Sequence, residues 1–232
     1  MKTKPLIAIV DYEMGNLHSV SKALEKAGGR VQITSSPSVI RMAAGVVLPG
    51  VGAFGEAIKR LASKRLSAPV AEALEKNRPF LGICLGLQLL FDRSEESARV
   101  KGLGFLKGDV VRFLGKPSPR RKSGPSALDT GFRRYDNLKV PHMGWNTLLR
   151  GPASRSRALR GVSKGSYFYF VHSFFPVPKD SSIVATRTVY GSPFCSSVAQ
   201  GRLFACQFHP EKSGDKGQVL LRNFVQEVAA CS

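Results

Sequence analysis

A cysteine between two glycines is the residue best placed for catalysis in this sequence. Cys84 follows the apolar residues 80–83, which have the length of a buried strand, and Gly82 and Gly86 flank it. This Gly-x-Cys-x-Gly pattern is typical of a nucleophile elbow, because a sharp strand-to-helix turn pushes the nucleophile out of the sheet and leaves no room for flanking side chains. The apolar residues 85–91 predict the helix, whose N-terminal N–H groups would favour the thiolate. A buried structural cysteine is the alternative that this pattern alone leaves open.

A cysteine nucleophile needs a base, and one of the four histidines is well placed for that role. His209 ends the apolar residues 203–208, Pro210 stops the strand, and Glu211 lies on the same side of an extended segment. A carboxylate beside an imidazole fixes its tautomer and stabilises the imidazolium. A simple turn after a strand would also fit these residues. The other histidines are expected in a helix, a loop and the middle of a strand: His18, His142 and His172.

Composition bounds the class of protein. The chain has 232 residues, of which 43% are hydrophobic, so it can bury a substantial core. No apolar run reaches the roughly 20 residues that a membrane helix needs. Its four cysteines have neither metal-type spacing nor the density of a secreted domain. We therefore expect a cytoplasmic protein with no metal site, no cofactor and no membrane contact.

The charge is strongly positive, with 35 Lys and Arg against 16 Asp and Glu, a net +19. Such a balance could serve a nucleic acid, an acidic protein partner or an anionic substrate. The basic residues are spread over the predicted helices and loops, however, and their one dense cluster, residues 120–122, has no interleaved aromatic side chains. We interpret the charge as mostly a solvated surface and expect no nucleic-acid binding.

Strands and helices alternate in the first half of the chain. This alternation predicts a mostly parallel open sheet flanked by helices, an α/β fold with right-handed crossovers. In such sheets ligands bind beyond the carboxyl ends of the strands. The Gly-rich residues 49–52 and the elbow both follow strands, so both should face one crevice. The expected strands are 6–10, 31–34, 45–48 and 80–83, and the expected helices are 17–27, 53–63, 68–76 and a brief one from Ser36-Pro37.

The second half is richer in strands and contains a polar, basic segment. The strands are expected at 109–114, 167–175, 183–190, 194–199 and 203–208, followed by a helix over 216–229. Residues 200–202 predict a tight hairpin turn, so part of this half should be antiparallel. Residues 115–137 have no helical or strand period and predict an exposed basic insertion. With no internal repeat or linker, a single domain over 1–232 is expected.

The motifs together resemble a known family. Residues 82–88 with 209–211 resemble the triad-type, class I glutamine amidotransferases, a family with a flavodoxin-like fold. Four further segments are similar to the glutaminase subunits of imidazole glycerol phosphate synthase: 49–54, 141–146, 169–173 and 209–214. The resemblance covers most of the chain in order. It departs at 115–137, where the family usually has a shorter connection, and in the high charge.

The resemblance implies an activity and a set of site residues. The activity is hydrolysis of glutamine to glutamate and ammonia through a glutamyl thioester, with Cys84 as nucleophile, His209 as acid and base, and Glu211 as its orienting partner. The oxyanion would be held by the amide of Leu85 and by the Gly-rich turn, which comprises Gly50, Val51 and Gly52. Gln88 would grip the amino-acid end of the substrate. Backbone contacts would come from Ser173 and its neighbours His172 and Phe174.

The resemblance also implies a partner. Glutaminases of this kind pass ammonia to a synthase, here a cyclase subunit with a (β/α)8 barrel, in a heterodimer of histidine biosynthesis. Three alternatives stay open from the sequence. They are a glutaminase that serves another synthase, such as the one making pyridoxal phosphate, an intracellular cysteine peptidase with the same triad, and a basic nucleic-acid module with an inert site.

Overall fold

The computed structural model of the chain describes residues 4–113 and 138–231. The basic insertion predicted at 115–137 lies outside the described residues, and the assignment of the whole chain to one domain stays a prediction. Across the described ranges, no helix is long and apolar enough to cross a membrane.

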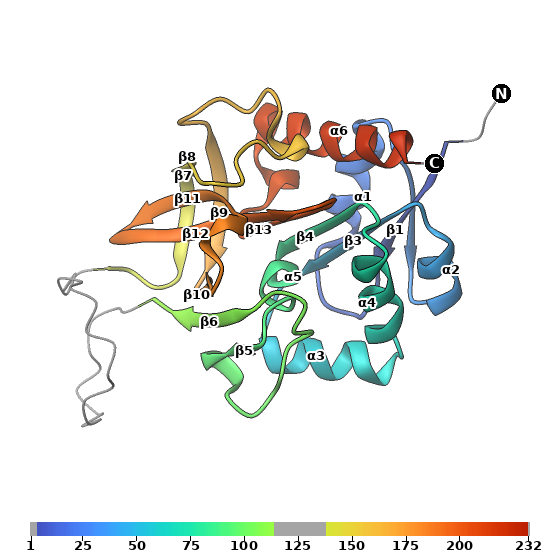
Figure 1. Ribbon diagram of the computed structural model, residues 1–232, viewed down its shortest axis with the longest axis horizontal. Coiled ribbons are helices and arrows are strands. Elements are labelled where there is room, and N and C mark those ends of the chain that lie inside the picture. Colours follow the sequence, from blue (N-terminus) through green and yellow to red (C-terminus); the bar gives the residue numbers. More distant parts are fainter. Residues whose placement is uncertain (1–3, 114–137, 232) are drawn as a thin grey trace.

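The centre of the fold is an eight-stranded sheet (Figure 1). Five strands run parallel in the order β2 (Arg30–Thr34), β1 (Leu6–Val10), β3 (Gly45–Gly50), β4 (Phe80–Cys84) and β13 (Leu203–Cys206). The sheet continues antiparallel through β12 (Ser192–Gln200), β11 (Val184–Tyr190) and β8 (Leu149–Arg150). This topology confirms the predicted α/β fold with a mostly parallel sheet and an antiparallel portion in the C-terminal half.

Helices cover both faces of the sheet, because its central strands are buried on both sides. In β1, Ala8 and Val10 pack into one core, with helices α2 (Pro37–Met42), α3 (Phe54–Ser63) and α4 (Ser67–Glu75). Ile7 and Ile9 point into the other core, with helices α1 (Leu17–Lys26) and α6 (Gly214–Ala230). As expected, α1 begins after Asn16, whose side chain accepts a hydrogen bond from the amide of Ser19.

Two smaller sheets flank the antiparallel end of the main sheet. One comprises β10 (Phe174–Pro178), β6 (Gly108–Arg112) and β5 (Arg93–Ser94), and the other is the ribbon of β7 (His142–Thr147) and β9 (Tyr167–His172). Four short 3-10 turns complete the described elements: η1 (Glu95–Ser97), η2 (Arg157–Leu159), η3 (Ser181–Ile183) and η4 (Pro210–Lys212).

The structure corrects two predictions in this region. The strand expected over 167–175 is broken at Ser173 into β9 and β10, which belong to different sheets. The break is invisible in the sequence because the residues on both sides of it are apolar and pack against a core. His142, expected in a loop, lies in strand β7 and pairs with His172. Its buried side chain points away from solvent, which a mixed polar and apolar sequence does not reveal.

A third correction concerns the helix after Cys84. It is a single turn, α5 (Leu85–Gln88), and does not extend to residue 91. The carbonyl groups of Leu89 and Leu90 accept hydrogen bonds from the amides of Leu103 and Leu106 instead of continuing the helix. A helix this short has only a small dipole, so the thiolate depends mainly on neighbouring side chains. The strand expected over 203–208 also ends early, at Cys206.

Candidate active site

Cys84 lies at the turn between β4 and α5 in a backbone conformation that is rare for a non-glycine residue, φ 54° and ψ −108°. The residues two positions before and after it, Gly82 and Gly86, must be glycines for steric reasons. A Cβ atom on Gly86 would overlap the carbonyl oxygen of Leu48, and one on Gly82 would come within 2.9 Å of the Cβ of Ala205. The strained turn is the geometry expected of a nucleophile elbow.

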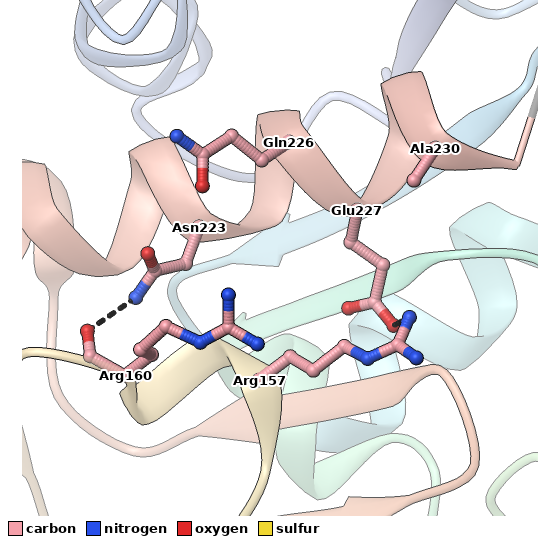
Figure 2. A pocket seen from close by; sticks show the side chains of 6 residues that line it. All are labelled: Arg157, Arg160, Asn223, Gln226, Glu227 and Ala230. Carbon is pink, nitrogen blue, oxygen red and sulfur yellow. Dashed lines mark hydrogen bonds and ion pairs between the residues drawn. The ribbon is translucent and has the colours of Figure 1, made fainter.

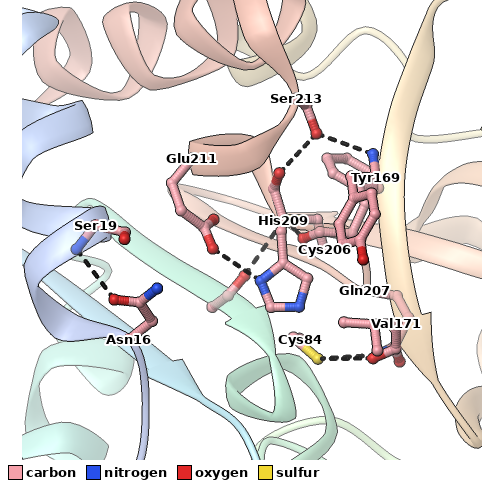
Figure 3. Close-up of polar contacts among 12 residues, drawn as sticks. Asn16, Ser19, Cys84, Tyr169, Val171, Cys206, Gln207, His209, Glu211 and Ser213 are labelled. Atoms are coloured by element: carbon pink, nitrogen blue, oxygen red, sulfur yellow. Dashed lines mark hydrogen bonds and ion pairs between the residues drawn. The ribbon is translucent and has the colours of Figure 1, made fainter. Parts of the chain in front are cut away.

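His209 and Glu211 form a buried pair that faces this elbow (Figure 3). The Nδ1 of His209 lies 2.8 Å from Oε1 of Glu211, and the two side chains are 3% and 1% exposed. The other ring nitrogen, Nε2, is buried and has no hydrogen-bond partner among the described residues. Figure 3 shows this edge of the ring turned toward Cys84. A base with one nitrogen held by a carboxylate and the other left free can exchange a proton with the sulfur or with a bound substrate.

The backbone around His209 is fixed to strand β9. The amide of His209 donates to the carbonyl oxygen of Tyr169 at 2.9 Å. The hydroxyl of Ser213 donates to the carbonyl oxygen of His209 at 2.6 Å and accepts from the amide of Tyr169 at 3.0 Å. The ring is therefore held in place by a turn, η4, and by the β7–β9 ribbon together.

Electrostatics favours the charged form of His209. Burial lowers the pKa of His209, but the nearby side chains of Cys84 and Glu211 outweigh burial and raise it to about 10. An imidazolium beside Cys84 stabilises the thiolate, which is the nucleophilic form of cysteine.

The residues expected to hold an oxyanion line the same turn. Gly50 pairs with Cys84 in the ladder between β3 and β4, so Val51 and Gly52 follow directly beside the elbow. The amides of Val51 and Gly52 donate no hydrogen bond to any residue of the described chain. The amide of Leu85 is the first of α5 and has no acceptor within the helix. These N–H groups are free to bind a negative oxygen.

Two glycines of this turn are required for different reasons. Gly52 has φ +100°, a conformation that side chains disfavour. Gly50 does not have a positive φ, and its lack of a side chain makes room for Tyr12, because a Cβ atom there would overlap the Tyr12 hydroxyl oxygen. That hydroxyl donates to the carbonyl oxygen of Pro49 at 2.7 Å. Tyr12, which sequence reasoning missed, therefore fixes the start of the turn.

Some polar atoms of the two residues expected to bind the substrate, Gln88 and Ser173, already form hydrogen bonds within the protein. Gln88 is 5% exposed, and its Nε2 donates to the carbonyl oxygen of Phe174 and to Oε1 of Gln207, both at 3.0 Å. Only its Oε1 is left for a ligand. Ser173 is half-buried, and its carbonyl oxygen accepts from the amide of Phe113 at 3.0 Å. Its hydroxyl makes no hydrogen bond within the described part of the chain.

Gln207 was also missed by sequence reasoning. It is fully buried, and its Nε2 lies 3.6 Å from the Sγ of Cys84. The signal was present in the spacing, since a residue two positions before His209 on an extended segment lies on the same side as His209.

Figure 2 shows a hollow between η2 and α6, where Arg157 lies 4.0 Å from Glu227 and Asn223 binds the carbonyl oxygen of Arg160. It contains no cysteine or histidine. Among residues 4–113 and 138–231, no group of three or more His, Cys, Asp or Glu residues could hold a metal ion.

Comparison with known proteins decides the family. Residues 8–228 match the model of the glutamine amidotransferase class-I family. The chain belongs to this family. The match spans the elbow, the histidine–glutamate pair and both helical faces, so the predicted membership in this family is confirmed.

Individual relatives agree with the family match. The chain is 47% identical over 222 residues to "Imidazole glycerol phosphate synthase subunit HisH" of Thermosynechococcus vestitus, covering 95% of this chain and 96% of the relative. It is 48% identical over 219 residues to the protein of the same name from Moorella thermoacetica, covering 94% and 93%. Among solved structures, PurLQS from Thermotoga maritima superposes with a TM-score of 0.64 at 19% identity, covering 97% of this chain and 99% of that chain, which shows the shared fold.

Proposed function

We propose that this class I glutamine amidotransferase is the glutaminase subunit of an imidazole glycerol phosphate synthase. It hydrolyses glutamine to glutamate and ammonia and passes the ammonia to a cyclase subunit. The observation that carries the proposal is the buried His209–Glu211 pair facing Cys84 at the elbow. Relatives that are 47% and 48% identical over nearly their whole length carry that synthase's name.

The first half of the reaction forms a thioester. The thiolate of Cys84 attacks the carbonyl carbon of the glutamine side chain, and the electron pair of the C=O bond moves onto oxygen. Free amides of Leu85 and of residues 51–52 stabilise that oxyanion, each worth about 3–4 kcal/mol. His209, as imidazolium, gives its Nε2 proton to the leaving nitrogen, so the C–N bond breaks and ammonia departs.

The second half restores the enzyme. Neutral His209 takes a proton from water, whose oxygen attacks the thioester carbon. The C–S bond then breaks, glutamate leaves, and the thiolate of Cys84 stands again beside an imidazolium. Glu211 holds Nδ1 of the ring throughout, so Nε2 is always the nitrogen that exchanges the proton.

Substrate binding draws on the atoms that the fold leaves free. The Oε1 of Gln88 can accept a hydrogen bond from the α-ammonium group of glutamine, since both of its amide hydrogens are used elsewhere. The hydroxyl of Ser173, at the break between β9 and β10, forms no hydrogen bond within the described chain and can also contact the substrate.

A surface for the cyclase lies on the outer face of the β7–β9 ribbon. Three large apolar side chains are exposed there: Met143 at 63%, Trp145 at 56% and Tyr167 at 60%. Tyr169 belongs to the same face, pairs with Trp145, and has its ring 6.5 Å from that of His209. Exposed aromatic and methionine side chains of this kind are typical of protein interfaces. A barrel docked on this face would cover the site and enclose a path for ammonia.

The test is glutamate release by the purified chain, alone and with the cyclase of its own organism. We expect glutamine to be hydrolysed in the complex and imidazole glycerol phosphate to form from glutamine. Loss of both on Trp145→Ala, with ammonium salts still supporting the cyclase, would support the docking surface. Turnover of peptides without turnover of free glutamine would favour a cysteine peptidase and contradict the proposal.

A further inference from the structure

One buried amide touches the nucleophile and has no part in the mechanism described above. We infer that Gln207 is a further catalytic residue, whose Nε2–H group hydrogen-bonds the thiolate of Cys84 in an orientation that Gln88 and the Phe174 carbonyl group impose. The inference rests on the proposed function, and it deepens that function. Gln207 is fully buried, with its Nε2 3.6 Å from Sγ of Cys84.

The orientation of Gln207 follows from its partner. Gln88 places one end of its amide 3.0 Å from the carbonyl oxygen of Phe174, and only the NH₂ end can be a donor there. The second hydrogen of that NH₂ group points to Gln207, whose facing atom must then be its oxygen, at 3.0 Å. The NH₂ group of Gln207 is left for the sulfur. A reversed Gln207 would set two donors against each other at Gln88 and an oxygen against the thiolate.

Two buried histidines fix the Phe174 carbonyl group in turn. Nδ1 of His172 lies 2.8 Å from that carbonyl oxygen, so Nδ1 carries a proton and Nε2 is an acceptor. Nδ1 of His142 lies 3.0 Å from His172 Nε2 and is therefore the donor. Nε2 of His142 then accepts from Nδ2 of Asn146, at 3.3 Å. Every group in this chain of hydrogen bonds has one consistent role.

The two histidines keep these roles over a wide pH range. Burial lowers the pKa of His142 to about 4. Burial also lowers the pKa of His172 to about 3, against a hydrogen bond to Phe174 that raises it, with His142 and His209 lowering it further. Both rings are thus neutral near pH 7. His142 is also held between the rings of Tyr190 and Phe170, at centroid distances of 4.0 and 4.9 Å.

Gln207 stabilises the thiolate form of Cys84 and not the thiol form. As a thiol, Cys84 donates to the carbonyl oxygen of Val171 at 3.9 Å, an interaction that the thiolate loses. As a thiolate, it accepts from Gln207 and is paired with the imidazolium of His209. Two other titratable groups interact electrostatically with it: Tyr12, on the turn after β1, and Cys206, on β13. Both are buried, and burial raises the pKa of each, so they stay neutral and His209 and Gln207 are the groups that favour the charge.

The experiment measures how readily Cys84 is alkylated by iodoacetamide as a function of pH, followed by mass spectrometry of the peptide containing residue 84. Gln207→Met keeps the side-chain volume and removes the donor. We expect the midpoint of alkylation to rise by about one to two pH units, as for a lost hydrogen bond to a charged acceptor. We also expect the kcat for glutamine in the cyclase complex to fall about tenfold or more, with KM within about twofold of the native value.

Two further variants make the result decisive. Gln218→Met is the matched control, because Gln218 also has a buried amide oxygen but lies on α6 and forms no hydrogen bond with a site residue of the described chain, so its alkylation profile should not move. Gln207→Glu keeps the acceptor for Gln88 and places a negative oxygen beside the sulfur, so its midpoint should rise further than that of Gln207→Met. Gln207→Glu replaces Gln207→Met as the test if circular dichroism shows that Gln207→Met does not fold.

The outcomes separate this inference from the proposed function. Alkylation requires neither glutamine nor cyclase, so an inactive native complex would refute the proposed function and leave the test of Gln207 intact. A folded Gln207→Met with an unchanged midpoint, or a Gln207→Glu that shifts no further than Gln218→Met, would overturn the inference.

Discussion

The buried pair of His209 and Glu211 makes the stability of the chain depend on pH in a defined direction. Replacing Glu211 by glutamine keeps an oxygen that can accept from Nδ1 of His209 but removes the charge. In the native chain, burial lowers the pKa of His209, while Cys84 and Glu211 together raise it to about 10. An unfolded histidine titrates near 6.5, so the fold preferentially binds the proton.

The size of the effect follows from that difference. A rise of the pKa from 6.5 to about 10 corresponds to about 5 kcal/mol in favour of the protonated form. Cys84 supplies part of it, and glutamine retains a neutral hydrogen bond, so we expect Glu211→Gln to lose about 1–3 kcal/mol. Because the folded pKa lies above the unfolded one, this stabilisation is complete below about pH 6.5 and disappears as the pH rises through about 10.

The assay is urea unfolding at pH 6, 8.5 and 10.5 of the native chain, Glu211→Gln and a surface control. Glu56→Gln is suitable, since the Glu56 side chain is 49% exposed and pairs with Arg60 at 2.9 Å. The loss in Glu211→Gln should be largest at pH 6 and approach zero at pH 10.5, while the control changes by less than about 1 kcal/mol throughout. A loss that grows with pH, or one that is the same at all three values, would refute the reasoning.

Four other predictions follow from the site. Cys84→Ala should abolish glutamine hydrolysis without unfolding the chain, while the bound cyclase still uses added ammonium salt; substantial remaining turnover would show another nucleophile. His209→Asn should lower turnover by several orders of magnitude and His172→Asn far less, and the reverse ranking would move the base to β9. Replacing residues 116–134 by a short Gly/Ser linker should leave stability and glutaminase activity nearly unchanged, which thermal unfolding and glutamate release would check. The lone chain should release glutamate about 10²–10³-fold more slowly than the cyclase complex, because residues 51–52 can turn a catalytic amide away; equal rates would exclude such gating.

The parts of the site that follow from local sequence could be predicted. The elbow depends on a strand, a turn and two glycines within seven residues, all of which the pattern at Cys84 contains. His209 and Glu211 depend on a strand end and one proline. What the sequence does not contain is the order of strands, which places β13 beside β4 with Ala205 opposite Gly82. That pairing, between segments more than 120 residues apart, brings His209 to Cys84.

The features that could not be predicted depend on contacts between residues that are distant in the sequence. Apolar residues 167–175 predict a strand but not the break at Ser173. The residues on both sides of the break are apolar and form strands, and only the fold shows that these strands belong to different sheets. A helix over 85–91 is favoured by its leucines, yet the carbonyl groups of Leu89 and Leu90 find partners in a later loop. Buried polar side chains such as Gln207 and His142 are tolerated only through hydrogen bonds with distant residues, and those partners are known only once the chain is folded.

The two faces of the β7–β9 ribbon carry different kinds of side chain. Its outer face exposes Met143 and Trp145, while its inner face holds the His142–His172 pair. Its backbone also fixes His209, whose amide donates to the carbonyl oxygen of Tyr169. A strand has a side-chain period of two, so a shift by one residue would exchange these faces completely. Divergence of the proposed docking surface is therefore restricted to substitutions that keep the register. If the cyclase docks there as proposed, exchanging one synthase partner for another would require new outer side chains on an unchanged ribbon, and an insertion or deletion here would weaken partner recognition and displace His209 together.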